Sequence, residues 1–517
     1  MSAHASLASV GKSVGKSVHT SVQMTAQCVI KLSRFIGCAP LMPRSICVHP
    51  DHRATVTSAL ARQGFLTQGD LAANTLIALS TVSRFFRGIR ISIANFEQLC
   101  EALDLEPKAV MLSLPDETSE NASASPSANA LPFDAPESIQ FFAYDPLWVG
   151  RDSLIATLTQ KLAQNCRLLL LTGLAGIGKT ALSERLSTEL QIHNRYRLLR
   201  ENFDNQELSA DFGSFAVRLL EGCGQPVLPE ERSQSGQLTR RLVAHLQTTP
   251  TLILIDSLEQ ILQGDEQTGW SEFIDPNFVT FFQAVLASET FQSRFVLTSQ
   301  ELPAQLVEAG SRYLNLWHRQ PIGGLSTAEQ QALFEKTGFA ADHDLARIGK
   351  AYEGHPLALR TILGEIGDRP FFGNVRAYWK RYGQEIESVE QSIAEAAAGN
   401  TAGADDKWQL ERFTRALRRN VQHRLEKTFE RLHQDARYAY ILLCETAVYR
   451  CPVPEAWWLS HLEDWQQDDN QSMMALDVLR DRYLVEEMIE DTELLLKQHN
   501  LIRSVSLAHL KQLTFEA

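Results

Sequence analysis

The sequence predicts a multidomain protein in which an α/β domain with a parallel sheet lies between helical domains. Three observations lead to this prediction. The chain has 517 residues, and one domain usually takes about 100–200 residues. Between residues 141 and 321, short apolar runs alternate with helical patterns, as buried parallel strands and their connecting helices do. Before and after that block the periodicity is almost purely helical.

Composition limits the classes of function. The chain carries 49 basic and 62 acidic residues and a net charge of −13, so a contact with DNA would need a local basic patch. The eight cysteines are dispersed and form no Cys-x-x-Cys pair, so we expect no zinc site. Free cysteines suit a reducing cytosol, and we expect a cytoplasmic protein. No apolar run approaches about 18 residues, so we expect no membrane span.

The ends of the domains are marked by changes in composition. Residues 1–50 are rich in serine and alanine and contain no acidic residue. This composition resembles a transit peptide, but we favour a disordered leader or a start at Met42. Two further segments are rich in small and polar residues and lack a hydrophobic pattern, and we expect flexible linkers at 116–140 and 392–406.

Three apolar runs are the expected strands of the central domain, residues 141–321. They are RLLLLTG (Arg167–Gly173), TLILID (Thr251–Asp256) and RFVLTS (Arg294–Ser299). Runs of this length that contain no alternating polar residues indicate strands with both faces buried.

A complete phosphate-binding pattern follows the first of these strands. Residues 173–180 fit G-x-x-x-x-G-K-[ST], and a helical pattern comes directly after them. Glycines let the backbone N–H groups turn inward onto phosphate oxygens, and the helix N-terminus adds positive charge. The pattern predicts that ATP or ADP binds with Mg²⁺, the lysine contacting phosphate and the threonine contacting the metal. The candidate residues are Gly173, Gly176, Gly178, Lys179, Thr180 and Ala181.

The second expected strand ends in a carboxylate. Asp256 would lie at the carboxyl edge of the sheet, where phosphate ligands bind, and would hold Mg²⁺ with Thr180. Glu259, three residues on, is the candidate that polarises an attacking water. In the alternative interpretation, Asp256 caps the following helix and Glu259 has no catalytic role.

With these motifs in place, residues 141–517 resemble the STAND class of signal-transducing ATPases, and within it the NB-ARC group. Residues 148–152, WVGRD, resemble a segment that packs on adenine. The alternative is a surface turn in which Asp152 caps a helix. The resemblance implies contacts with the nucleotide from Val149, Gly150 and Arg151.

Three more segments resemble parts of that family. Residues 295–300 resemble its sensor strand, which normally ends in arginine; here the residue is Gln300. Residues 354–357 resemble a G-x-P motif whose proline, Pro356, contacts the nucleotide, although they could simply begin a helix. His499 resembles a winged-helix histidine that contacts the β-phosphate of ADP, or else it is an exposed histidine. A neutral amide cannot supply the charge of an arginine, so we expect hydrolysis to be slow.

The N-terminal segment 51–115 resembles the helix-turn-helix of small phage-repressor-like domains. The resemblance rests on LTQGDLA (66–72) followed by ALSTVSRFFRG (78–88). The second helix of such a domain enters the major groove. The alternative is a helical adaptor that binds a protein, because the basic and acidic residues of this segment balance. The residues expected to face DNA are Ser80, Thr81, Ser83, Arg84 and Arg87.

The resemblance completes the domain plan with a helical subdomain at 322–391 and a winged-helix-like domain at 407–517. It implies a nucleotide-gated switch that is closed with ADP, self-associates with ATP, and answers to an unknown protein trigger or effector. The first hypothesis is a regulator that binds DNA through residues 51–115. The second is a signalling scaffold that recruits a protein in stress or phage defence. The third is a constitutive ATPase.

Overall fold

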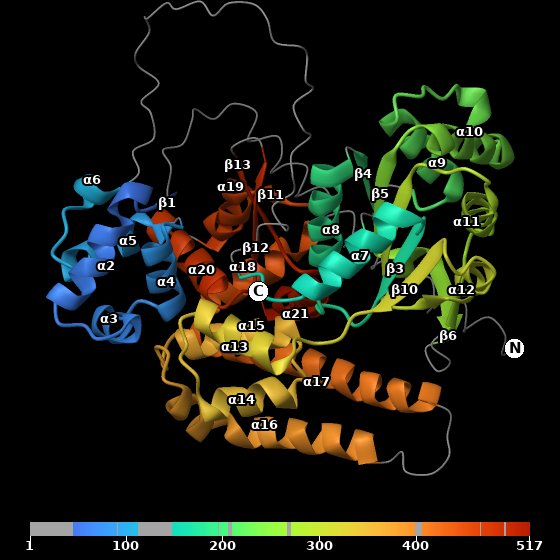
Figure 1. The fold of residues 1–517 in the computed structure, drawn as a ribbon. Helices are drawn as coiled ribbons and strands as arrows, with labels where there is room; N and C mark the ends of the chain where they lie inside the picture. The colour runs from blue at the N-terminus through green and yellow to red at the C-terminus, as the bar shows by residue number, and fades with distance from the viewer. Residues whose placement is uncertain are drawn as a thin grey trace, which may run out of the picture. The chain divides into compact units, whose positions relative to one another are not determined.

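The computed structural model describes residues 45–89, 91–111, 147–194, 196–204, 209–265, 270–398, 406–465, 467–490 and 493–516. The chain divides into two units, Met1–Ile46 and Cys47–Ala517. Only strand β1 (Ser45–Ile46) of the first unit is described, and the elements that position the predicted site belong to the second (Figure 1). Most of the expected leader and the whole expected linker at 116–140 lie outside the described residues.

A five-stranded parallel sheet confirms the predicted α/β core. Its order is β10-β3-β8-β5-β4, and every pair is parallel. The three apolar runs became β3, β5 and β8, whose residues are buried except Asp256 at the end of β5. All carboxyl ends meet at one edge, which brings the loops after them together. The strands are β3 (Leu168–Thr172), β4 (Arg197–Asn202), β5 (Thr251–Asp256), β8 (Arg294–Ser299) and β10 (Trp317–Pro321).

Helices cover this sheet on both sides, α7 and α8 on one and α9 to α12 on the other (Figure 1). The second side packs through phenylalanines, among them Phe212, Phe278 and Phe281. A small sheet of β6, β7 and β9 lies beside it. The elements are α7 (Asp152–Gln164), α8 (Lys179–Asn194), α9 (Phe212–Gly222), η3 (Pro229–Glu231), α10 (Ser235–Thr248), η4 (Leu258–Ile261), β6 (Leu262–Asp265), β7 (Trp270–Phe273), α11 (Asn277–Ala287), β9 (Leu302–Pro303) and α12 (Ala304–Ser311).

Five helices follow the sheet, α13 (Thr327–Lys336), α14 (His343–Ala351), α15 (Pro356–Gly367), α16 (Val375–Ala398) and α17 (Asp406–Asp435). Helix α16 continues through residues 392–398. The described start of the segment expected to be a linker at 392–406 is therefore helical, because the alanine-rich sequence favours helix.

A buried ionic cluster joins this helical subdomain to the C-terminal domain. Glu365 of α15 pairs with Arg424 and Arg431 of α17, and Arg482 of the C-terminal domain pairs with Asp368. The ion pairs replace the water that these charged groups lose on burial.

The C-terminal domain combines helices with a three-stranded antiparallel sheet of order β11-β13-β12. Its apolar core also takes Leu425, Phe429 and Leu432 from α17. The elements are α18 (Arg437–Glu445), η5 (Thr446–Val448), β11 (Val453–Pro454), α19 (Glu455–Leu459), η6 (Ser460–Trp465), α20 (Asp469–Asp481), β12 (Glu486–Glu490), β13 (Glu493–Lys497) and α21 (Asn500–Glu516).

The N-terminal domain is a group of short helices around Phe85 and Phe96, both fully buried. A capping box starts α3: Asp70 N–H donates to Thr67 Oγ1 (3.1 Å), and Thr67 N–H donates to Asp70 Oδ2 (2.8 Å). Gly88, with φ of 68°, ends α4. The elements are η1 (Pro50–His52), α2 (Arg53–Arg62), α3 (Gln68–Thr75), α4 (Leu79–Arg87), β2 (Ile91–Ser92), α5 (Ile93–Ala102) and α6 (Pro107–Val110). Among the described residues, no helix is long and apolar enough to cross a membrane.

Candidate nucleotide site

The predicted phosphate loop lies between β3 and α8. Its glycines are required by geometry: Gly176 has φ of 74° and Gly178 has φ of 93°, values that side chains disfavour. A Cβ on Gly176 would lie 2.7 Å from Leu357 Cδ2. The loop is therefore packed directly against the start of α15.

Lys179 is buried at the start of α8. Its Nζ donates to the carbonyl oxygens of Gly173 and Leu174, both at 3.0 Å. Burial lowers the pKa of this amine, while Glu259 and Asp256 raise it. A phosphate at this loop would supply the opposite charge that a buried ammonium needs.

Thr180 and Asp256 lie together, as the sequence predicts for a magnesium site. Thr180 Oγ1 donates to Asp256 Oδ1 (3.0 Å) and Oδ2 (3.1 Å). Thr298 of β8, which the sequence analysis did not select, also donates to Asp256. The carboxylate does not cap the next helix, whose N-cap is Ser257. One carboxylate and one hydroxyl fit Mg²⁺, which keeps most of its waters in such sites.

Glu259 is held by Gln300, the residue directly after β8. Gln300 Nε2 donates to Glu259 Oε1 (2.7 Å), and Gln300 N–H donates to Oε2 (3.1 Å). Both carboxylate oxygens are thus engaged, and the carboxylate is tied to the end of β8.

The WVGRD segment is attached to the phosphate loop through Arg151. Its guanidinium donates to the carbonyl oxygens of Ile177 (2.7 Å) and Gly323 (3.0 Å). Its backbone N–H donates to Glu329 of α13 (2.6 Å). Arg151, not Asp152, is the N-cap of α7. Through the hydrogen bonds of Arg151, the segment links the phosphate loop to the helical subdomain.

His355 makes a contact with the loop that the sequence analysis did not identify. Its Nε2 lies 2.9 Å from the carbonyl oxygen of Ala175, and its Nδ1 accepts from Ala358 N–H (3.4 Å). Burial lowers the pKa of His355 to about 3, so the ring is neutral and donates through Nε2. The next residue, Pro356, begins α15. The histidine in the G-x-P motif was the available signal.

His499 reaches the same place from the C-terminal domain. Its Nδ1 accepts from Leu501 N–H (3.1 Å), so the neutral ring carries its proton on Nε2. Burial, Lys497 and Lys179 together lower the pKa of His499 to about 3. The ring lines the same cavity as the phosphate loop and is not an exposed surface histidine.

One cavity of about 360 Å³ is lined by most of these residues, although not by His355. Most residues selected from the sequence line it, together with Trp148, Lys336, Arg360 and Tyr483, which were not selected. Gly150 and Gly173 lie beside it without lining it. The selected lining residues are Val149, Arg151, Gly176, Gly178, Lys179, Thr180, Ala181, Asp256, Glu259, Gln300, Pro356 and His499.

Residues 148–303, which contain the phosphate loop, Asp256 and Gln300, match the family described as Novel STAND NTPase 6. The nucleotide-binding domain is a STAND-class P-loop ATPase domain. An uncharacterized WD repeat-containing protein from Nostoc sp. is 28% identical over 315 residues. That match covers 58% of this chain and 24% of the relative, so the chain spans about a quarter of the relative's length.

The solved structures that match this chain include Cdc6p from Pyrobaculum aerophilum, at 13% identity and a TM-score of 0.32. That match covers 73% of this chain and 98% of the Cdc6p chain. The Orc1 protein of Aeropyrum pernix, solved in complex with DNA, is 11% identical with a TM-score of 0.30. That match covers 74% of this chain and all (100%) of the Orc1 chain.

Of the residues expected to face DNA, three are buried and two are partly buried. Ser80, Thr81 and Ser83 of α4 are buried, and Arg84 pairs with Glu487 of β12 at 3.3 Å. Arg87 donates to the carbonyl oxygen of Lys336 at the end of α13. Helix α4 also lines the STAND domain's cavity through Ser80, Ser83, Arg84 and Arg87.

Proposed function

We propose that this protein is a switch that binds ATP or ADP with Mg²⁺ and that the bound nucleotide sets whether its terminal domains are held or released. The observation that carries this proposal is the shared cavity. The STAND domain, α15, the C-terminal domain and α4 all line it. A ligand that contacts four parts of a chain can change the free energy of their arrangement.

The chain's own groups suit a nucleotide bound with its phosphates at the loop. Lys179 would exchange its bonds to the loop carbonyls for bonds to phosphate, and Thr180 and Asp256 would hold Mg²⁺, which neutralises phosphate charge. His499 Nε2–H would donate to a phosphate oxygen. Val149, Arg151 and Pro356 would contact the base and sugar. Calorimetric titration with ADP and ATP, with and without Mg²⁺, tests the assignment.

Hydrolysis is expected to be slow, because Glu259 is occupied by Gln300 and no arginine stands at the end of β8. Gln300→Arg should therefore raise the single-turnover hydrolysis rate, or the preference for ATP over ADP, by about 10-fold, since a charge-assisted bond to the γ-phosphate is gained. Gln300→Met, which adds no charge, is the control. If the arginine variant matches the parent in both measurements, residue 300 is not a sensor.

His499→Ala should weaken ADP binding by roughly 10- to 150-fold, because a hydrogen bond to a charged phosphate is worth about 1.5–3 kcal/mol. It should also raise self-association in the presence of ADP, because the C-terminal domain loses a contact with the nucleotide. Titration calorimetry and light scattering measure the two effects. His343→Ala, at an exposed position on α14, is the matched control. A variant that binds ADP like the parent and stays monomeric would remove His499 from the switch.

The N-terminal domain is proposed to bind DNA in the released state, which makes the protein a nucleotide-gated regulator. The support is the residue set on α4 and the start of α5: arginine, hydroxyl and amide groups are those that contact DNA phosphates and base edges. A shift assay with the full chain and duplex DNA, in ADP and in ATP, tests this part.

A further inference from the structure

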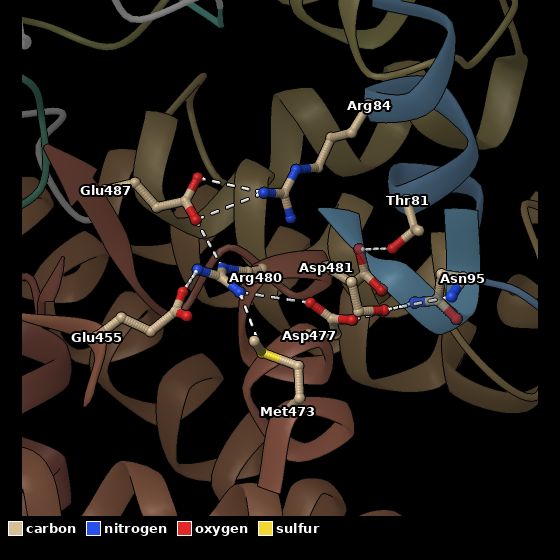
Figure 2. Close-up of polar contacts among 10 residues, drawn as sticks. Thr81, Arg84, Asn95, Glu455, Met473, Asp477, Arg480, Asp481 and Glu487 are labelled. Carbon is tan, nitrogen blue, oxygen red and sulfur yellow. Dashed lines mark hydrogen bonds and ion pairs between the residues drawn. The ribbon is translucent and has the colours of Figure 1, made fainter. Parts of the chain in front are cut away.

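The face formed by α4 and the start of α5 carries the donor side chains of Thr81, Arg84 and Asn95. Carboxylates of the C-terminal domain cover this face (Figure 2). Thr81 Oγ1 donates to Asp481 at 2.5 Å. Arg84 donates to Glu487 at 3.3 Å. Asn95 Nδ2 donates to Asp477 at 3.1 Å. In each of these pairs the N-terminal group donates and the C-terminal group is a carboxylate, which presents acceptor oxygens as a phosphate does.

Two of these carboxylates lie close together on one helix. Asp477 and Asp481 stand four residues apart on α20, where like charges repel. Burial and the neighbouring Asp477 raise the pKa of Asp481 to about 7. Arg480, between them, pairs with Asp477, Glu455 and Glu487. Thr81 therefore supplies the hydrogen bond that the buried Asp481 needs, while Arg84 and Asn95 add donors to Glu487 and Asp477, which Arg480 already pairs.

Two further observations describe how α4 is held in this contact. Ser80 Oγ is buried and has no hydrogen-bond partner among the described residues, so the contact leaves part of the donor set unused. Leu79 fits against glycines of the helical subdomain, with Gly373 near its Cδ2 and Gly338 near its Cγ. The interface therefore combines one apolar anchor with a row of donors.

We propose that Asp477, Asp481 and Glu487 occupy the place of DNA phosphates on α4 and the start of α5, so that the C-terminal domain and duplex DNA compete for this one face. This inference rests on the proposed function of the N-terminal domain. DNA is favoured over a protein partner because the face offers arginine, hydroxyl and amide donors to acceptors that are all carboxyl oxygens. Because the net charge of the chain is −13, the chain as a whole does not attract DNA, and binding would depend on this local face.

The test uses the full chain and a fluorescent duplex of mixed sequence, measured by anisotropy with ADP present. Asp481→Asn combined with Glu487→Gln should tighten DNA binding by about 10-fold or more, which is a typical coupling between two sites. These amides keep the shape of the carboxylates. Adding Arg84→Met to the double variant should abolish the gain, because Arg84 would then contact DNA.

A matched control separates competition from a change in total charge. Glu230→Gln with Glu308→Gln removes two exposed carboxylates from the STAND domain and should leave DNA affinity within about 2-fold of the parent. The proposal is overturned if both double variants gain the same DNA affinity. It is also overturned if Asp481→Asn with Glu487→Gln folds and binds DNA only as tightly as the parent. If the double variant does not fold, Glu487→Gln alone, at a partly exposed residue, is read in the same way.

ADP titration of the same samples distinguishes this inference from the proposed function. Normal ADP binding with no DNA binding by any variant would overturn the competition and leave the nucleotide switch standing. Absence of ADP binding by the parent would instead overturn the switch itself.

Discussion

Lys179→Ala is expected to abolish nucleotide binding while the fold survives. The buried ammonium is the only lysine side chain that bonds to the loop among the described residues, through the carbonyl oxygens of Gly173 and Leu174. Truncating a buried charge partner of a ligand costs about 2–5 kcal/mol, which is roughly 30- to 5,000-fold in affinity. Calorimetric titration with ADP measures the loss.

Alanine removes the desolvated amine itself, so the free protein should not be destabilised by the change. Circular dichroism and the thermal midpoint of the nucleotide-free variant check this point. Lys350→Ala, at an exposed position on α14, is the control and should bind ADP like the parent. Unchanged ADP affinity in Lys179→Ala would contradict the placement of phosphate at this loop.

Glu365→Ala is expected to produce the largest loss of stability. Glu365 is buried, accepts from Thr428 Oγ1 and Arg431 Nη1, each at 2.7 Å, and pairs with Arg424. Its removal leaves buried arginines without their shared carboxylate, and breaking such a pair costs about 3–5 kcal/mol. Denaturant unfolding measures the loss. Glu390→Ala, which breaks a more exposed pair with Arg347, should cost less than about 1 kcal/mol.

The same carboxylate gives the stability a defined dependence on pH. Burial alone would raise the pKa of Glu365, but Arg424, Arg431 and Arg482 lower it to about 2. A lowered pKa in the folded state means that Glu365 stabilises the fold above about pH 4.5, its ordinary value, and that this contribution is lost as the pH falls toward 2. Glu365→Ala should therefore flatten the acid limb of the stability profile. An unchanged acid limb would contradict the assignment.

Local patterns are enough to predict that Thr180 and Asp256 lie together. The loop, its strand and Asp256 follow from a spacing and an apolar run that act within a few residues, so the contact between Thr180 and Asp256 could be expected. Strands β4 and β10 were not identified, because polar residues interrupt their apolar pattern. Thr298 and His355 lie on segments that were identified, but their bonds to Asp256 and Ala175 depend on how those segments pack.

The N-terminal domain shows where sequence patterns stop being informative. The helices around Phe85 follow from capping and periodicity, yet Thr81 and Asp481 are separated by 400 positions in the chain. Nothing local in α4 indicates that its polar side would be buried, because the residues that bury it lie in another domain. Gln300 is a second example. Its neutral side chain predicted poor sensing of the γ-phosphate, but its hydrogen bonds to Glu259 could be found only in the structure.

The position of α4 as a wall of the nucleotide cavity has a thermodynamic consequence. If nucleotide and DNA favour opposite positions of this helix, reciprocity requires each to weaken the other's binding by the same factor. DNA would then act as a nucleotide-exchange factor: a duplex that captures α4 would open the cavity and speed the departure of ADP. DNA binding would then control which nucleotide is bound as well as depend on it. A promoter-sized duplex could cause the release of ADP without any other trigger.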